Sequence, residues 1–302
     1  MKVVRRLCAL MLGPAAVVMM SGAAVASPAS EAVDLPDGMT ASYAVFDRET
    51  GASWGHDVHK QYRSASVVKL FIALDYLESH GPEYVIPPED LALLEPMLRS
   101  SDDDAASVLW VRDGWEQIVV RMAAEIGLPD TAPPAERGKW GYTAISAADV
   151  VRTYQYILTE AHPNYRDFIM GNLYQATRCA ADTFDQSFGI PSALPGAWAY
   201  KQGWSGFGAA PAPGEECVEQ SQVVPDTQEV RDAIAAVNRD HARSKTAPDI
   251  DLTSRAMHTT GTDDEKIVVV LTLEPTTLSW QDSADRITDL AEAVYDGDSD
   301  GL

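Results

Sequence analysis

Hydrophobic and polar positions alternate near the start of the chain, a pattern typical of strands that bury one face. Residues 42–47 alternate in this way, a turn-forming stretch follows at 48–51, and residues 52–58 alternate again. This pattern predicts a β-hairpin. The next segment, 66–77, is apolar on nearly every side and is closed by Gly81, so it predicts a buried central helix.

Apolar residues then recur at helical spacing through the middle of the chain. The segments at 115–126, 146–158 and 165–173 each carry such a stripe, and Ser146 with Asp149 forms a capping pair at the start of the second one. The middle of the chain is therefore predicted to be helical.

The pattern changes again after residue 196. Residues 197–204 alternate like a strand, 255–260 can form the next, and 266–273 is a β-branched run typical of a buried strand. An amphipathic helix is expected at 279–294. Strands near both ends with helices between them predict an α+β fold.

Two halves follow from this arrangement. The sheet half should consist of residues 27–65 and about 195–302, and the mainly helical half of about 66–194. The long span between the strands at 197–204 and 255–260 contains a helical stripe with Val230, Ile234 and Val237 on one side. This span is interpreted either as an insertion at the edge of the active site or as decoration without a role.

Residues 1–26 have the pattern of a signal peptide. A cationic start precedes a short apolar run at 7–20, and residues 24–26 form an A-x-A cleavage site. We expect a mature chain of 27–302 in a secreted or extracytoplasmic location, without a stable membrane span after cleavage. The apolar run is short for a span, and an uncleaved anchor is the alternative.

The chain is strongly acidic, with 45 Asp and Glu residues against 23 Lys and Arg residues and a formal charge of −22. Such a surface repels nucleic acid, and no basic run offsets the charge. We therefore expect no nucleic-acid partner. The six histidines are scattered and no zinc-ligand spacing is present, so neither a metal nor another cofactor is expected.

Two cysteines remain after the expected cleavage, Cys179 and Cys217. Exported proteins fold where disulfides can form. A bridge between these two would close a loop of nearly forty residues and add about 3–4 kcal/mol to the free energy of unfolding. Two lone buried thiols are the alternative.

A serine and a lysine share one face at the start of the predicted 66–77 helix. Ser66 and Lys69 are three residues apart, and a helix N-terminus stabilises developing negative charge. An apolar setting disfavours the ammonium form of a lysine, which would let Lys69 take the serine proton. Ser66 is therefore the candidate nucleophile and Lys69 the candidate base.

Two further polar segments follow in order, one at the start of a helix and one on a strand. They consist of Ser101, Asp102 and Asp103, and of Lys201, Gln202, Gly203 and Trp204. With Ser66 and Lys69 they resemble the S-x-x-K, S-D-N and K-T-G motifs of class A β-lactamases and penicillin-binding proteins. The chain looks most similar to secreted actinobacterial β-lactamase-related serine hydrolases, in which K-x-G-W and W-G-x-T stretches recur, the latter here at 140–143.

The resemblance implies a β-lactamase/transpeptidase-like fold, with an antiparallel sheet and an inserted helical domain, and a role for each motif residue. Ser66 would attack a carbonyl and Lys69 would accept its proton. Ser101 would pass a proton to the leaving nitrogen, and Lys201 would hold a substrate carboxylate. The backbone N–H groups of Ser66 and Trp204 would bind the oxyanion.

Three positions depart from the family pattern. Asp103 stands where the motif has asparagine, so an acceptor replaces an amide, and Gln202 stands where it has threonine. Class A β-lactamases deacylate with a glutamate in an E-x-x-L-N stretch. Residues 131–143 hold only Glu136, without that signature, and this side chain is expected at the surface. Affinity for ordinary penicillins should therefore fall, and deacylation should be slow.

Three functions remain open after these departures. The first is an exported serine hydrolase, expected to be a monomer, that acts by acyl-enzyme chemistry on β-lactams or peptidoglycan-derived amides. The second is a slow penicillin-binding or D-Ala-D-Ala carboxypeptidase-like protein. The third is a non-catalytic binding protein with the same fold. Near the expected site, His258 is interpreted as a structural histidine, and Trp204 either lines a ligand groove or packs in the core.

Overall fold

The computed structural model describes residues 33–219, 221–243 and 248–296. The predicted signal peptide at 1–26 lies outside these ranges. Within them, no helix combines the length and the apolar character that crossing a membrane requires.

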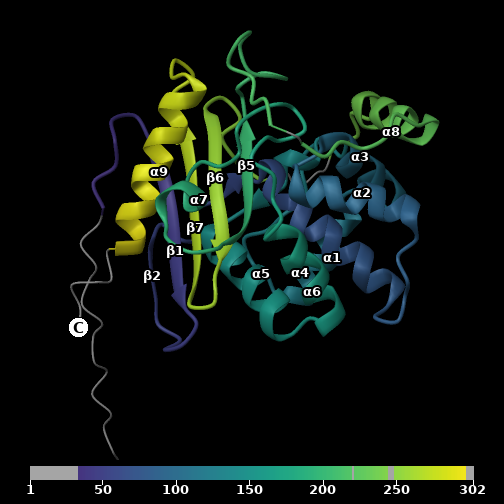
Figure 1. The fold of residues 1–302 in the computed structure, drawn as a ribbon, viewed down its shortest axis with the longest axis horizontal. Coiled ribbons are helices and arrows are strands. Elements are labelled where there is room, and N and C mark those ends of the chain that lie inside the picture. Colours follow the sequence, from purple (N-terminus) through teal and green to yellow (C-terminus); the bar gives the residue numbers. More distant parts are fainter. Residues whose placement is uncertain (1–32, 220, 244–247, 297–302) are drawn as a thin grey trace, which may run out of the picture.

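One layer of the molecule is a five-stranded antiparallel sheet with the strand order β2-β1-β7-β6-β5 (Figure 1). Its strands come from both ends of the described chain, which confirms the predicted α+β fold. They are β1 (Thr40–Asp47), β2 (Ser53–His56), β5 (Ala199–Ser205), β6 (Arg255–Thr262) and β7 (Lys266–Glu274). Because β5 is an edge strand, one of its backbone edges has no strand partner among the described residues and faces the helical half of the molecule.

The central strand β7 is buried on both faces, as its β-branched sequence predicts. Successive side chains on a strand point to opposite faces. Val269 and Leu271 therefore belong to the core shared with the helical half, and Val268 and Val270 to the core beneath α9 (Trp280–Asp296). In Figure 1, α9 covers one side of the sheet and the helical half lies on the other. The sheet thus separates two hydrophobic cores.

The helical half is built around α1. Its helices are α1 (Lys69–His80), α2 (Pro88–Arg99), α3 (Asp103–Arg112), α4 (Gln117–Ile126), α5 (Ala147–Thr159) and α6 (Pro163–Leu173). Every residue from 69 to 77 is buried, which confirms the predicted central helix. The chain enters α1 through a turn of 3-10 helix, η1 (Ala65–Val68), and Ser146 caps α5 as predicted, with its side chain accepting a bond from the Asp149 N–H.

Some short elements escape prediction from the pattern. The sequence analysis did not assign α2, which contains Pro96, or α7 (Ile190–Ala193). It also did not assign the two-stranded sheet of β3 (Tyr62–Arg63) and β4 (Ala144–Ile145). α7, β3 and β4 are too short to show a period of their own. In α2, apolar residues do recur at helical spacing, at Leu93, Leu94, Met97 and Leu98, but Pro96 argues against a helix in the sequence.

The segment between β5 and β6 returns to the helical half. Its helix α8 (Gln228–Arg239) packs on α3 and not on the sheet, although its residues fall within the range expected for the sheet half (Figure 1). Upstream of α8, Cys217 forms a disulfide with Cys179, with the two Cα atoms 5.4 Å apart. The predicted disulfide is confirmed.

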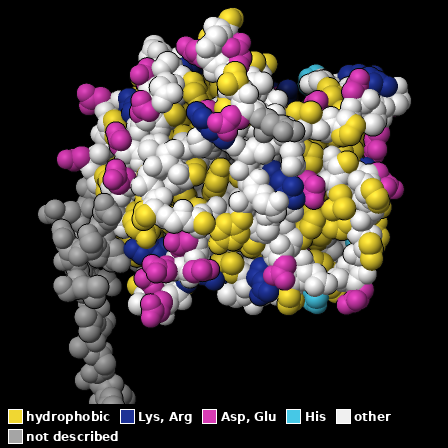
Figure 2. Space-filling model, in the orientation of Figure 1, with side chains coloured by type: hydrophobic (Ala, Val, Ile, Leu, Met, Phe, Trp, Pro, Cys, Tyr) yellow, Lys and Arg dark blue, Asp and Glu magenta, His cyan; other side chains and the backbone are white. Residues whose placement is uncertain are grey.

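Acidic side chains are spread over the visible surface. Figure 2 shows Asp and Glu around most of the outline, with Lys and Arg at fewer places. The distribution follows from the excess of acidic residues in the composition.

Candidate functional site

Ser66 lies on η1, directly beside the edge strand β5. Its residue surface is 6% exposed. The approach of the strand requires a glycine at position 203, because a Cβ there would lie 2.9 Å from the Ser64 carbonyl oxygen and 3.3 Å from the Ser66 nitrogen. The glycine of the K-x-G segment therefore brings the β5 backbone against the backbone of the candidate nucleophile.

Lys69 extends from the first turn of α1 into a cage of oxygen atoms. Its Nζ lies 2.7 Å from Ser66 Oγ, 2.5 Å from the Ser101 carbonyl oxygen and 2.6 Å from Asp103 Oδ1. The lysine side chain is fully buried, whereas that of Asp103 is 65% exposed. The Trp140 ring covers the amine at 5.0 Å from the ring centroid, an arrangement that attracts a cation.

Lys201 reaches the same place from β5. Its Nζ lies 2.6 Å from Ser101 Oγ, and the Gln202 carbonyl oxygen is 3.5 Å away. Ser101 Oγ is in turn 3.5 Å from the Lys69 amine. The structure thus brings the two hydroxyls and two amines predicted from the sequence into one buried, continuous cluster.

Burial lowers the pKa of the Lys201 amine well below its usual range, and the nearby charge of Lys69 adds to this effect. The carboxylates of Asp103 and Asp182 act in the opposite direction. Asp182 receives a hydrogen bond from Trp204 Nε1 at 3.0 Å, and burial raises its pKa to about 6. The network therefore contains two amines with different partners: Lys69 contacts a carboxylate, and Lys201 contacts a hydroxyl.

Two residues of the site have left-handed backbone conformations. Ala65, just before the nucleophile, has a φ of 45°, and Ser101 has a φ of 56°. Side chains other than glycine rarely adopt this region, and each such residue costs of the order of 1 kcal/mol. Strain of this kind persists where surrounding contacts hold it and is common at functional sites.

The segment that follows the disulfide holds the backbone on both sides of Ser101. The N–H of Gln222 donates to Ser100 Oγ at 2.7 Å, and the N–H of Val224 donates to Asp102 Oδ2 at 2.8 Å. Asp102 also caps α3, since its Oδ1 accepts from the Ala105 N–H. We call residues 217–219 and 221–224 the strap; they include Cys217 of the disulfide and the two residues that bind the neighbours of Ser101.

A cleft of about 330 Å³ opens above the cluster. Ser66, Asp103 and Trp204 are among the residues that line it. The Trp204 ring also packs edge-on against Phe184, Phe188 and Trp280 at the core beneath α9, so both interpretations of Trp204 hold.

Trp140 and Tyr142 of the W-G-x-T stretch and Ile234 and Val237 of the insertion stripe also line the cleft, although the sequence did not assign them to the site. Asp104, Ser107 and Asn238 line it as well, without a sequence signal. The helical stripe between β5 and β6 was the signal in the sequence for the α8 side of the cleft. Because α8 lines the cleft, the structure favours the interpretation of this span as an insertion at the edge of the site over decoration without a role.

Two predicted residues lie away from the cleft. The amide of Gln202 donates to the Phe188 carbonyl oxygen, and the residue is 1% exposed. Its side chain is therefore directed into the interior and not towards a ligand. Glu136 forms ion pairs with Arg243 at 2.7 Å and His241 at 3.7 Å. These contacts place Glu136 in a surface ion-pair cluster, as predicted.

His258 is a structural residue, as predicted. It is fully buried, and its Nδ1 accepts from the Thr272 N–H, so the opposite nitrogen, Nε2, donates to the Arg63 carbonyl oxygen at 2.8 Å. Burial lowers the pKa of His258 to about 4. The imidazole is therefore neutral near pH 7 and has both nitrogens satisfied.

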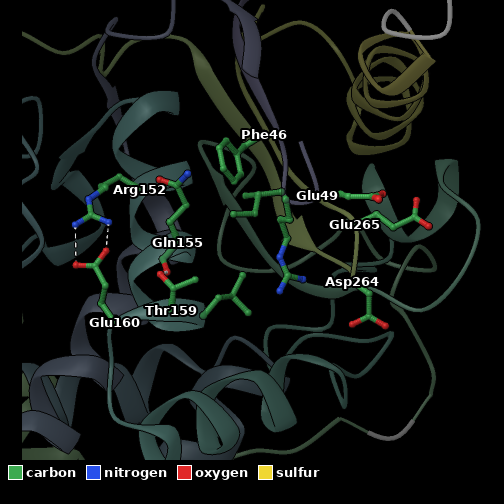
Figure 3. A pocket seen from close by; sticks show the side chains of 11 residues that line it. Phe46, Glu49, Arg152, Gln155, Thr159, Glu160, Asp264 and Glu265 are labelled. Carbon is green, nitrogen blue, oxygen red and sulfur yellow. Dashed lines mark hydrogen bonds and ion pairs between the residues drawn. The ribbon is translucent and has the colours of Figure 1, made fainter. Parts of the chain in front are cut away.

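A larger cavity lies elsewhere, beside β1, α5 and the β6–β7 turn (Figure 3). It has a volume of about 680 Å³ and is open to solvent. Phe46 lies on one wall, and Arg152 pairs with Glu160 on another. None of the predicted site residues lines it. Within the described ranges, no group of three His, Cys, Asp or Glu side chains is arranged to hold a metal ion.

Sequence comparison finds relatives for part of the chain. No family model matches it. Proteins named "Putative lipoprotein LppW" from Mycobacterium bovis and Mycobacterium tuberculosis are 40% identical over 173 residues, which cover 55% of this chain and 54% of the relative. The chain thus spans about half the length of the curated relatives it matches.

Comparison with solved structures covers most of the chain. PBP-A is 15% identical and has a TM-score of 0.59, with 88% of this chain and 92% of that chain covered. A class A β-lactamase from Bacteroides cellulosilyticus is 14% identical, with a TM-score of 0.57 and 86% and 92% covered. A class A β-lactamase from Mycobacterium abscessus is 13% identical, with a TM-score of 0.56 and 85% and 93% covered. This chain therefore has the fold of class A β-lactamases and PBP-A.

Proposed function

We propose that the protein is an exported serine hydrolase that opens a β-lactam or a related cell-wall amide through an acyl-enzyme on Ser66. The observation that carries this proposal is the single buried network that joins Ser66, Lys69, Ser101 and Lys201 beneath an open cleft. Nucleophile and amine within hydrogen-bond distance form the arrangement that activates a serine.

The chemistry would proceed in two parts. Ser66 Oγ attacks the substrate carbonyl while its proton passes into the amine network. The carbon–nitrogen bond then breaks, and Ser101 supplies a proton to the leaving nitrogen. The backbone N–H groups of Ser66 and Trp204 are the candidate oxyanion donors, because Gly203 brings the two backbones together.

An extracytoplasmic location is part of this proposal. It is supported by the predicted signal peptide and by the name lipoprotein that the LppW relatives carry. The confirmed disulfide agrees with folding in an oxidising compartment.

A second candidate is a slow penicillin-binding or carboxypeptidase-like protein. It is favoured by Glu136, whose carboxylate is occupied by Arg243 and does not line the cleft. A variant of PBP-A, which shares the fold at a TM-score of 0.58, is described as an acyl-enzyme complex with penicillin G. Slow deacylation would leave such a complex as the end state.

The test is intact-mass spectrometry after exposure to benzylpenicillin. Wild-type protein should gain the mass of one penicillin, and Ser66→Ala should gain none, a loss of at least about 10⁴-fold in acylation rate. Thr159→Ala, which removes a hydroxyl from the larger cavity, is the matched control and should acylate like wild type. Turnover of a chromogenic cephalosporin then distinguishes the two candidates. A hydrolase would give many cycles, and a slow penicillin-binding protein would give a single burst. Failure of several acylating probes to label wild type would leave the non-catalytic binding protein as the better account.

A further inference from the structure

The two buried lysines have unequal partners. Lys69 has a carboxylate oxygen of Asp103 at 2.6 Å and a carbonyl oxygen of Ser101 at 2.5 Å. Neither atom can donate a hydrogen bond, and the carboxylate charge stabilises an ammonium at this distance. Lys201 has one close partner, the Ser101 hydroxyl at 2.6 Å, and that group can donate to a neutral amine.

An ammonium at Lys201 would also be poorly satisfied. Three N–H groups would share one hydroxyl and one carbonyl oxygen 3.5 Å away, in a side chain that is 1% exposed. A buried charge without partners is strongly disfavoured. The neutral form lets Ser101 Oγ–H donate to the amine and leaves less charge unsolvated.

On the basis of the proposed function, we propose that Lys201 is the proton acceptor for acylation, and that Lys69 is a relay held as an ammonium by Asp103. The hydrogen-bonded path runs from Ser66 Oγ to Lys69 Nζ at 2.7 Å, on to Ser101 Oγ at 3.5 Å, and ends at Lys201 Nζ at 2.6 Å. This order moves the role of final proton acceptor, which the family resemblance implies for Lys69, to Lys201.

In this proposal, one proton passes along the path to Lys201 during acylation. Ser101 gives its hydroxyl proton to neutral Lys201, Lys69 gives one proton to Ser101 Oγ, and Ser66 gives its proton to Lys69 as its oxygen bonds to the acyl carbon. Lys69 and Ser101 end as they began, and Lys201 becomes an ammonium. When the acyl carbon–nitrogen bond breaks, its electron pair stays on nitrogen, which takes the proton of Ser101, and Lys201 replaces that proton.

Each group that faces Lys201 bears on its charge. Lys69 on α1 disfavours the ammonium form, and Asp103 on α3 and Asp182 after α6 favour it. The hydroxyl of Tyr154 on α5 forms a hydrogen bond with Thr260 on β6, and this phenol carries no charge near pH 7. Burial outweighs the carboxylates, because the pKa of Lys201 is lowered well below its usual range.

The first experiment measures the lysine charges directly in the full chain. The chain has only seven lysines, so ¹³Cε-lysine NMR can follow each of them, with assignment by Lys→Arg variants. At pH 7 the Lys201 signal should be that of a neutral amine and the Lys69 signal that of an ammonium. A charged Lys201 beside a neutral Lys69 at pH 7 would overturn the proposal.

The second experiment measures the rate of acylation by benzylpenicillin at pH 7. Lys201→Arg replaces the neutral amine by a guanidinium that stays protonated and cannot accept a proton, so the acylation rate at pH 7 should fall by about 10²-fold or more. The exposed Lys60→Arg is the control and should leave the rate unchanged. A Lys201→Arg protein that is folded and acylates at the wild-type rate overturns the assignment. If wild type itself is not acylated, the proposed function fails, and the NMR measurement still decides which lysine is neutral.

Discussion

The two largest differences between the candidate cleft at Ser66 and the larger cavity of Figure 3 are burial of charge and backbone strain. The larger cavity is bordered by charges that remain in water, such as Arg152 and Glu160, whose side chains are 35% and 48% exposed. The smaller cleft lies above Lys69 and Lys201, which are almost completely buried, and beside the strained Ser101. Cavity volume therefore does not point to the cluster of motif residues in this molecule. Desolvated titratable groups and strain are the better guides.

The strongest test of this contrast is the substitution of Ser101 by glycine. Glycine adopts a positive φ without a steric cost, but loss of the hydroxyl leaves the buried Lys201 amine without its close partner. The two effects oppose each other, so the free energy of unfolding should change by less than about 1 kcal/mol. The hydroxyl is lost, so acylation should fall by about 10²–10³-fold. Chemical denaturation and intact-mass kinetics on the same preparation measure both. A variant that is folded and fully active would show that the serine hydroxyl has no part in the chemistry.

Removal of the disulfide should have the next largest effect. Replacing Cys179 and Cys217 together with serine should lower the free energy of unfolding by about 2–4 kcal/mol, because the unfolded chain loses a cross-link. Acylation should also slow, because the strap that binds Ser100 and Asp102 starts at this bridge. Denaturation with and without reductant measures the stability effect. Unchanged acylation in the double variant would show that the strap holds its position without the disulfide.

The close approach of β5 to η1 can be tested with a pair of glycines. Gly203→Ala should lower stability by about 1–3 kcal/mol and slow acylation, since the new Cβ would lie 2.9 Å from a backbone oxygen. Gly171 lies in α6 with open space around it. Gly171→Ala should therefore raise stability by about 0.5–1 kcal/mol. Thermal unfolding of the two variants measures the contrast, which is lost if both change in the same direction.

The smallest effect is expected in the larger cavity. Arg152→Ala removes an ion pair with Glu160 between two partly exposed side chains. Such pairs contribute about 0–1 kcal/mol because water already solvates both charges. Stability should therefore change by less than about 0.5 kcal/mol, and acylation should be unchanged. A large loss of acylation in this variant would mean that the two regions are coupled.

Much of the fold can be predicted because its patterns are local. The buried run of β7, the apolar face of α1 and the cap at Ser146 each depend on neighbouring residues, and the structure confirms all three. The short pair β3 and β4 escaped prediction, since two-residue strands have no period and exist only through their partner. The position of α8 on α3 also depends on a distant surface.

By itself, the sequence determined which chemical groups are available: Ser66 and Lys69 on one helical turn, Ser101 at a helix start and Lys201 on a strand. Spacing of three residues fixes a shared face because helical geometry is local. Only the tertiary structure decided that Asp103 pairs with Lys69 and that Gln202 turns into the interior. Both outcomes depend on contacts between residues that are distant in the sequence, and on how much water each polar group loses when it is buried.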